Sequence, residues 1–232
     1  MSSSTTVKSG PQVITASSFN IANMKFGVAK DNSGNNGGKS VAITYNGGPL
    51  MVQTPKMTSP YGVNKWDNVG GGSKISVDLS FGDVTENPEC AAFFEMCKAL
   101  NTAFVNEGLA NSNAWFKKKH NSADVIEALY TNLIKYSKDK TTGEQSTVYP
   151  PTFKVNLPQN DGVNSFTVYD SKKEQIDLDS VDLKGAEIRV IMVCSGIWLA
   201  GGKFGCTWRA QQMQVTPRLT KIKDFAFVEE TD

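Results

Sequence analysis

Residues 186–216 read AEIRVIMVCSGIWLAGGKFGCTWRAQQMQVT, and they predict a long antiparallel β-hairpin. The two arms, 186–197 and 205–216, are rich in the apolar and β-branched residues that favour strands. Between the arms, Gly201 and Gly202 supply the backbone freedom that a sharp turn requires. We therefore expect two long neighbouring strands in this part of the chain.

Aromatic rings and positive charges surround this turn. Trp198 and Phe204 flank the two glycines, and Lys203 and Arg209 stand beside the rings. Unpaired bases stack on aromatic rings for about 1–3 kcal/mol each, while lysine and arginine hold the phosphates. These four residues therefore give a hypothesis of single-stranded nucleic-acid binding.

The alternative is that the tryptophans belong to the hydrophobic core. If Met192 and Cys194 face inward, strict alternation along the strand places Trp198 inside as well. A bulge at Ser195–Gly196 reverses this facing, and a glycine within a strand often marks such a bulge. We expect the bulge and an outward Trp198, and we expect Trp208 to lie in the core.

Other stretches of the chain also have strand patterns, with turn-forming glycine and asparagine clusters between several of them. These stretches are 23–28, 40–45, 74–81, 152–157 and 165–169. A short strand is expected at 12–16 as well. The β pattern therefore occupies both ends of the chain and leaves its middle free.

The middle of the chain, 86–138, has a helical pattern. Pro88 suits a first helical turn, and apolar residues then recur at steps of three and four up to Gly108. A second amphipathic helix is predicted from Ser122, whose hydroxyl can cap it. Its buried side would consist of Val125, Ile126, Leu129, Leu133 and Ile134.

This order predicts a mainly β fold with a helical insertion, of the α+β class. An OB-fold-like closed barrel with two helices between its third and fourth strands fits it. We expect a flexible N-terminal arm over 1–18 and an OB-fold domain over 19–219 with the insertion at 86–138. Residues 220–232 are expected to form a short acidic and aromatic C-terminal tail.

Composition limits the classes of partner. The 232 residues carry a formal net charge of +1, so any site for a polyanion has to be local. The start MSSSTTVKSG is polar, and no stretch has the roughly eighteen apolar residues of a membrane span. We expect a cytoplasmic or nuclear protein with no membrane partner.

Cysteine and histidine are too few and too scattered for a metal site. Cys90, Cys97, Cys194 and Cys206 show no CxxC spacing, and His120 is the sole histidine. The first two cysteines are seven residues apart in a helical pattern, as core residues would be. A reducing compartment disfavours a disulfide between the other two. No metal and no cofactor are expected.

Catalytic motifs are also not apparent. The loop 34–40 resembles a phosphate-binding loop, but three residues instead of four separate its first glycine from the Gly-Lys pair, and a strand pattern follows it. The carboxylates of 177–182 suit a solvated loop, and no Ser-His or Cys-His arrangement is visible. We expect a protein that is not an enzyme.

Two further stretches combine rings with lysines. The segment 115–120, WFKKKH, is either a phosphate-contacting patch or a solvated loop whose rings pack inward. Its candidate contacts are Lys117, Lys118 and Lys119. The loop PYGVNKW adds Lys65 and Trp66 as outlying candidates.

The C-terminal third resembles the replicative single-stranded-DNA-binding protein of podoviral phages and its relatives in large nucleocytoplasmic DNA viruses. The residues that carry the resemblance are FTVYDSKK (166–173), DLKG (182–185), IRVIMV (188–193), IW (197–198) and the strand that ends at Val215. The shared features are a strand that ends in DSK-like residues, a glycine before a basic strand, and a tryptophan that opens a glycine-containing turn.

The resemblance implies an OB-fold with a helical insertion and binding of single-stranded DNA with little sequence preference, and members of that family often form homodimers. It implies a base-stacking role for Trp198 and a basic strand position for Arg189. The phage proteins also recruit replication proteins through a long acidic tail that ends in an aromatic residue. Residues 224–232 hold four acids and two phenylalanines, a reduced form of such a tail.

Together, these observations predict a protein that coats single-stranded DNA during viral or phage DNA replication or recombination. It would act in the host cell, with packaging into virions as a further alternative. The second hypothesis is a β-barrel virion or scaffold protein whose exposed rings anchor protein contacts. The two differ in whether the chain binds single-stranded oligonucleotides.

Overall fold

The computed structural model describes residues 12–32, 38–67 and 73–218. The α-helices are α1 (Pro88–Ala110), α2 (Ser112–Phe116) and α3 (Ala123–Leu129), and the 3-10 helices are η1 (Ala16–Ser18), η2 (Ile21–Asn23) and η3 (Leu178–Ser180). The first strands are β1 (Val13–Thr15), β2 (Met24–Phe26), β3 (Lys30–Asp31), β4 (Lys39–Val41), β5 (Ile43–Tyr45), β6 (Met51–Gln53), β7 (Met57–Thr58), β8 (Val63–Asp67) and β9 (Ser73–Ser80). The later strands are β10 (Tyr130–Thr131), β11 (Ile134–Lys135), β12 (Ser137–Lys138), β13 (Gln145–Ser146), β14 (Thr152–Leu157), β15 (Gln159–Asn160), β16 (Val163–Asn164), β17 (Thr167–Tyr169), β18 (Gln175–Ile176), β19 (Glu187–Ala200) and β20 (Lys203–Thr216). The chain is mainly β with few helices, as the sequence predicts.

Five strands pair in a closed circuit. β19 pairs with β7, β7 with β9, and β9 with β14, each antiparallel. β14 pairs with β20 in parallel, and β20 returns to β19 along the long hairpin. Alternate residues of these strands face one shared interior, where the buried side chains include Val77, Val155, Val190, Met192 and Trp208. The predicted core position of Trp208 is confirmed.

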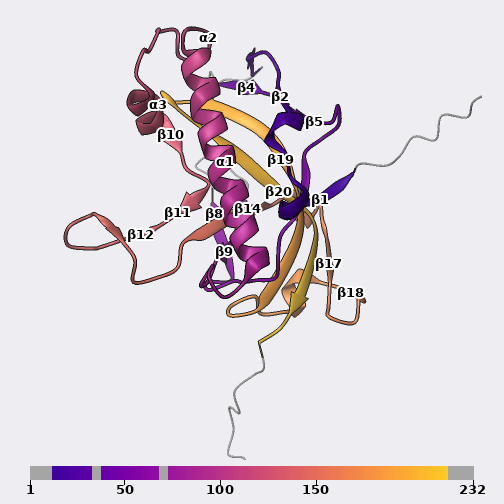
Figure 1. Cartoon of the computed structure of the whole chain (residues 1–232). Coiled ribbons are helices and arrows are strands. Elements are labelled where there is room, and N and C mark those ends of the chain that lie inside the picture. Colours follow the sequence, from indigo (N-terminus) through magenta and orange to yellow (C-terminus); the bar gives the residue numbers. More distant parts are fainter. Residues whose placement is uncertain (1–11, 33–37, 68–72, 219–232) are drawn as a thin grey trace, which may run out of the picture.

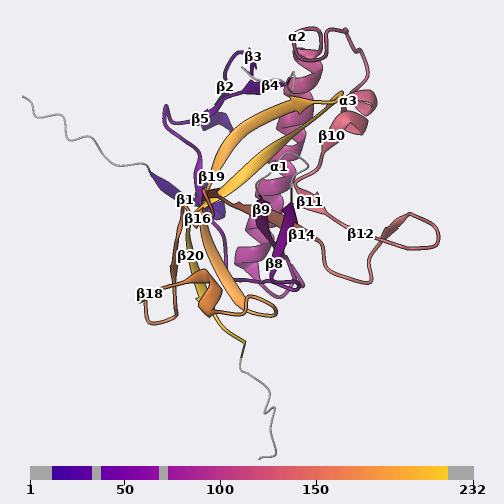
Figure 2. The ribbon, with the colours of Figure 1, turned by 180° about the vertical axis from the view of Figure 1, so that it is seen from behind.

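The long hairpin runs diagonally through the molecule, with α1 lying across it (Figure 1). Seen from behind, the hairpin lies in front of the helix (Figure 2). Pairing extends from Glu187 opposite Thr216 to Ala200 opposite Lys203, so 14 residues of each arm are strand. The predicted hairpin is therefore confirmed.

The predicted bulge is present in β19. The register shifts between Cys194, which pairs with Trp208, and Ile197, which pairs with Cys206. Ser195 and Gly196 stand opposite the single residue Thr207, so β19 has one extra residue there, and the glycine has a φ of +93°. Even-numbered residues face inward before the bulge and odd-numbered ones after it. The bulge therefore turns Trp198 to the outside.

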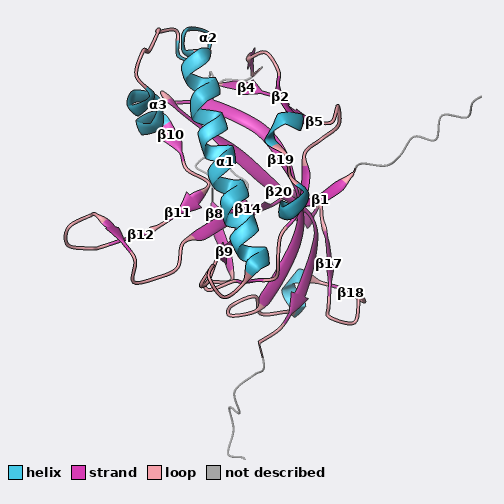
Figure 3. Ribbon diagram, viewed as in Figure 1, coloured by secondary structure: helices cyan, strands magenta, loops and turns pink. Residues whose placement is uncertain are grey.

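α1 has a defined start and one buried stripe. Asn87 caps it, since its Oδ1 accepts hydrogen bonds from the backbone N–H groups of Glu89 at 3.0 Å and Cys90 at 3.1 Å. Pro88 stands in the first turn, as predicted. The buried residues recur at steps of three and four and are Cys90, Phe93, Met96, Cys97, Leu100, Phe104 and Gly108. This stripe covers the strands seen in magenta behind the cyan helix in Figure 3.

The predicted second helix is too long. α3 ends at Leu129, and Val125 is 43% exposed. The chain then extends because Tyr130 and Thr131 pair with β20 as β10. Asn101 on α1 fixes this exit, since its Oδ1 accepts hydrogen bonds from the Tyr130 hydroxyl at 2.7 Å and the backbone N–H of Leu133 at 3.1 Å. Long-range pairing with β20 thus overrides the helical spacing of the apolar residues.

The N-terminal end of the described chain differs from the predicted arm in one respect. Within the predicted arm 1–18, the short strand expected at 12–16 is present as β1 (Val13–Thr15), which pairs in parallel with β6, and η1 follows it. These residues are part of the sheet rather than of an arm. Residues 1–11 and the predicted tail 220–232 lie outside the described residues.

Candidate nucleic-acid interface

One face of the strand circuit carries most of the candidate residues. Along β14, Phe153, Val155 and Leu157 are buried, so Lys154 and Asn156 between them face outward. Asn156 pairs with Ser76 of β9 on one side and with Arg209 of β20 on the other. Residues that pair on neighbouring strands point to the same face of the sheet, so Ser76 and Arg209 face outward together with Asn156.

The same face extends to a tryptophan at each end. On β8, Asn64 pairs with Ser76, so Trp66 two residues later shares the outward side. On β19, Trp198 pairs with Gly205, which has the same facing as Arg209 on β20. We call this surface the outer face, and it consists of Trp66, Lys154, Asn156, Arg209 and Trp198.

Trp198 lies flat against the strand beside it. A Cβ at Gly205 would stand 2.7 Å from Cζ2 of the indole, so only glycine leaves room for the ring there. The half-buried ring lines a cleft of about 180 Å³ together with Lys135, Lys154 and Asn156. The cleft therefore offers an aromatic surface and two cations within one site.

Trp66 is the more open of the two rings. It is 48% exposed, and the Lys154 ammonium stands 4.0 Å from the centre of its ring. Lys154 also lines the Trp198 cleft. One lysine thus lies between the two indoles.

A single carboxylate organises these cations. Oδ1 of Asp78 lies 3.9 Å from the Lys154 ammonium and 4.0 Å from that of Lys135, and Oδ2 accepts a hydrogen bond of 2.9 Å from Asn64. Burial lowers the pKa of Lys154, and the neighbouring Asp78 charge opposes this effect. The carboxylate holds both lysines at the outer face, although its own charge repels phosphate.

The hairpin tip does not present Phe204 to solvent, so the prediction of a base-stacking Phe204 is wrong. The ring is fully buried, with its centre 5.7 Å from that of Trp115, 5.5 Å from Phe116 and 5.1 Å from Tyr130. No local pattern in the sequence predicts an interior at a hairpin tip. α2 and β10 pack over the tip and create one.

Lysines predicted separately come together at this tip. Lys203 of the turn and Lys117 and Lys118 after α2 line one pocket, with Lys39 of β4 as a fourth lysine. Lys119 is exposed and does not line it. The aromatic residues of the WFKKKH segment pack inward while its lysines stay in solvent, as the solvated-loop alternative predicts, and phosphate contact by these lysines stays a prediction.

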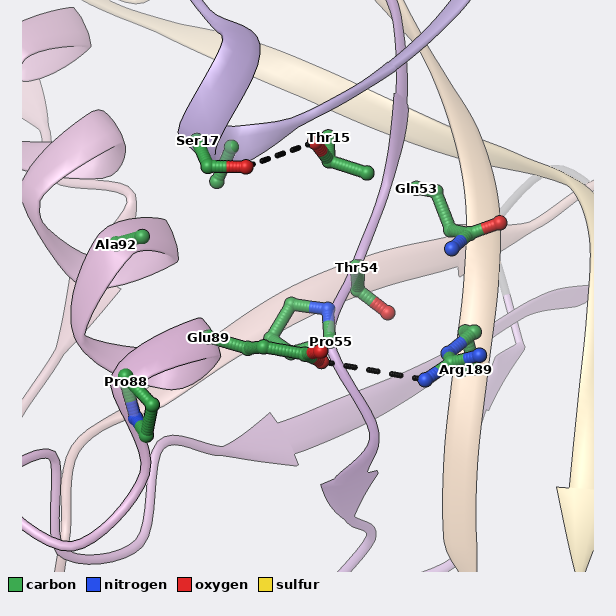
Figure 4. A pocket seen from close by; sticks show the side chains of 10 residues that line it. Thr15, Ser17, Gln53, Thr54, Pro55, Pro88, Glu89, Ala92 and Arg189 are labelled. Carbon is green, nitrogen blue, oxygen red and sulfur yellow. Dashed lines mark hydrogen bonds and ion pairs between the residues drawn. The ribbon is translucent and has the colours of Figure 1, made fainter.

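Two predicted residues lie apart from the outer face. Arg189 lines a different pocket, between β6 and the start of α1, where its Nη2 stands 3.9 Å from Glu89 Oε2 (Figure 4). Its Nε is buried without a hydrogen-bond partner. Lys65 alternates with Trp66 along β8, so it points to the other side of the strand.

A family model described as "Family of unknown function (DUF5871)" matches residues 83–229, more than half of the chain. The chain belongs to the DUF5871 family. The match spans α1 through β20, so Lys154, Trp198 and Arg209 lie within it, whereas Trp66 precedes it. The outer face therefore combines residues from the family region with one from outside it.

A curated relative of this DUF5871 chain is the uncharacterized protein L291 of Acanthamoeba polyphaga mimivirus. The two are 23% identical over 184 residues, which are 78% of this chain. The match spans only 28% of the length of the mimivirus protein.

Solved structures similar to the DUF5871 chain include gp2.5, a single-stranded DNA binding protein encoded by bacteriophage T7. That likeness has a TM-score of 0.42 and 16% identity, and it covers 78% of this chain and 98% of that one. The single-stranded DNA-binding protein of bacteriophage Enc34, in complex with ssDNA, gives a TM-score of 0.37 and 10% identity over 85% of this chain and 98% of that one. Phage single-stranded-DNA-binding proteins and a large DNA virus, the two groups named by the sequence resemblance, are both present among these matches.

Sequence reasoning missed Lys135, Lys154, Asn156 and Asp78. The signal for two of them is present in TFKVNL, where Lys154 and Asn156 alternate with three apolar residues. Alternation marks them as outward, but only the pairing of β14 with β9 and β20 places them between two tryptophans. Among the described residues, no three His, Cys, Asp or Glu side chains are arranged to hold a metal ion, and no helix is long and apolar enough to cross a membrane.

Proposed function

We propose that the DUF5871 chain binds single-stranded DNA across its outer face, without catalysis and without strong sequence preference. The observation that carries the proposal is the placement of two accessible indoles, Trp66 and Trp198, on one face with Lys154 between them. Every base has a flat surface that can stack on an indole, and cations between the rings can hold the phosphates. Bases in a duplex are already stacked and paired, so this face favours single strands.

We also propose an architecture and a cellular setting for this binding. The circuit of β19, β7, β9, β14 and β20 would be the OB-type closed barrel, with the helices inserted between β9 and β14. The chain would act on DNA exposed during viral replication or recombination, in the cytoplasm or nucleus of the host, and the relative in a mimivirus supports the viral host-cell setting alone. Dimer formation and contacts to replication proteins through 220–232 belong to the same proposal.

The deciding experiment is a titration of tryptophan fluorescence with oligo-dT. Stacking of a base on Trp66 or Trp198 should quench the emission, whereas Trp115 and Trp208 are buried and expose no ring face on which a base could stack. The matched duplex should quench far less at the same salt concentration. An absence of binding to both forms would overturn the proposal and favour the virion or scaffold alternative.

Arg209→Ala should make the salt dependence of binding shallower. Arg209 is exposed on the outer face, and a single phosphate contact changes the slope of log affinity against log salt by about 0.7 for single strands. We expect the slope to become shallower by the amount of about one phosphate contact, measured by oligo-dT titrations at several salt concentrations. Lys138→Ala, in the exposed β12–β13 hairpin, is the control and should leave the slope unchanged. An unchanged slope in the Arg209 variant would remove this residue from the phosphate path.

Asp78→Asn should strengthen binding. The substitution removes the one carboxylate beside Lys135 and Lys154 but keeps an oxygen that can accept the hydrogen bond from Asn64. Release of the lysines should increase affinity for oligo-dT by roughly two- to fivefold at low salt, the range of a partly exposed ion pair. Asp139→Asn, which changes the net charge equally in the distant β12–β13 turn, is the control. Weaker binding of the Asp78 variant would show that its carboxylate is needed to position the lysines.

A further inference from the structure

The pocket at the end of the long hairpin is separate from the outer face. We call it the tip pocket, and its lysines are Lys39, Lys117, Lys118 and Lys203. It has a volume of about 370 Å³ and shares no lining residue with the Trp198 cleft. Figure 1 shows the surrounding elements, α2 and β4, at the same end of the molecule.

Three separate segments bring these lysines together. Lys39 pairs with Leu199 across β4 and β19, and Lys203 pairs with Ala200 at the last position of the hairpin. Lys117 and Lys118 come from the loop after α2. The Lys39 ammonium donates a hydrogen bond of 2.8 Å to the Ala114 carbonyl, which ties β4 to α2. Pairing and this bond hold the segments in place.

The backbone at Lys117 is held in an unfavourable conformation. Its φ of +57° lies in the left-handed region, which costs a residue with a side chain roughly 1–2 kcal/mol. The adjacent Phe116 ring packs on the buried Phe204 and fixes the end of α2. Packing thus maintains a turn that directs both Lys117 and Lys118 to the pocket.

Among the described residues, the lysines of the tip pocket form no ion pair, although Asp31 stands opposite Lys39 across β3 and β4. No carboxylate lines the pocket, and none of the four lysines lies within 4.0 Å of a carboxylate in the described part of the chain. The rest of the lining is His120, two glycines of the turn and apolar side chains such as Trp115, Leu129 and Leu199. Low-dielectric walls strengthen the field of such a cluster, so it attracts anions.

We propose that the tip pocket binds a phosphate group that carries two or more negative charges. A backbone phosphodiester carries one charge, whereas a phosphomonoester carries nearly two and a polyphosphate more. Four ammonium groups around one pocket match the higher charge. The ligand is a free nucleotide or the phosphorylated end of a nucleic-acid strand, and this inference does not depend on binding across the outer face.

The test is calorimetric titration of the full chain with inorganic tripolyphosphate. Lys118→Ala/Lys203→Ala is the informative variant, because Lys39 supports the fold through Ala114 and alanine at Lys117 would keep the strained backbone. Loss of two charged contacts should weaken tripolyphosphate binding by about tenfold or more. Lys138→Ala/Lys140→Ala removes the same charge from the β12–β13 hairpin and should bind as the natural sequence does.

Further titrations separate the two sources of phosphate. Stronger binding of dTTP than of a 5′-phosphorylated oligo-dT indicates a free nucleotide, and a preference for the phosphorylated over the 5′-hydroxyl oligo-dT indicates a strand end. Trp66→Ala/Trp198→Ala should leave tripolyphosphate binding unchanged, so failure of the outer face and failure of the tip pocket are distinguishable. No tripolyphosphate binding, or equal binding by the two lysine variants, would overturn the inference.

Discussion

Trp66→Ala/Trp198→Ala is expected to abolish most of the affinity for single-stranded DNA. Each base–indole stack contributes about 1–3 kcal/mol, so loss of both should cost roughly 2–6 kcal/mol if the rings act independently. The phosphate contacts remain, so residual binding should be weak and strongly dependent on salt. The measurement is fluorescence anisotropy of labelled oligo-dT with the natural sequence, both single variants and the double variant.

Two controls separate stacking from folding. Trp198→Leu retains an apolar side chain over Gly205 but has no aromatic surface, whereas Trp198→Phe retains a ring. We expect the phenylalanine variant to bind more tightly than the leucine variant. Tyr61→Ala removes a ring that is 59% exposed outside the outer face and should have no effect. Equal affinities of the leucine and phenylalanine variants would show that stacking on Trp198 does not contribute.

The regular parts of the fold could be predicted because their signals are local. Asn87, Pro88 and the apolar steps that follow define α1 within the chain itself. Residues 186–216 likewise contain both arms of the hairpin and the glycines of the turn, and their pattern even locates the bulge. In these segments the local preference and the tertiary contacts agree.

One cause explains why the sequence predicts neither the end of α3 at Leu129 nor the burial of the Phe204 ring. Both depend on β10, which pairs Tyr130 and Thr131 with Phe204 and Gly205 across more than seventy positions of sequence. The apolar spacing up to Ile134 fits a helix equally well, so local pattern alone gives the wrong element. The pairing of β10 with β20 therefore both ends α3 and places Tyr130 over the hairpin tip.

The candidate site was predictable by residue type but not by grouping. Trp66, Trp198 and Arg209 stand out as rings and charge in strand or loop patterns, and the structure brings them to one face. Arg189 has the same chemistry but faces Glu89 in another pocket. Which cations accompany which rings depends on strand register between β9, β14 and β20, and single-strand alternation does not encode register.

Gly196→Ala is expected to destabilise the protein more than any other single glycine substitution near the hairpin. At Gly196 the φ of +93° disfavours a side chain, and a Cβ would stand 2.4 Å from the carbonyl oxygen of Val41. The backbone conformation alone costs about 1–3 kcal/mol, and β4 would also have to move away. We expect a total of roughly 3 kcal/mol or more, which lowers Tm by about 6–12 °C in a chain of this size.

Gly201→Ala is the matched control for this substitution. Gly201 also has a positive φ, +58°, but no atom lies within 4 Å of a Cβ built there. It should therefore show only the conformational cost, about 1–2 kcal/mol, and the difference between the two variants measures the contact with Val41. Because the bulge turns Trp198 outward, the folded fraction of Gly196→Ala should also lose the part of the quenching by oligo-dT that comes from Trp198, while Gly201→Ala retains it. Equal Tm values for the two variants would mean that β4 does not constrain the bulge, and the outward placement of Trp198 would then need another cause.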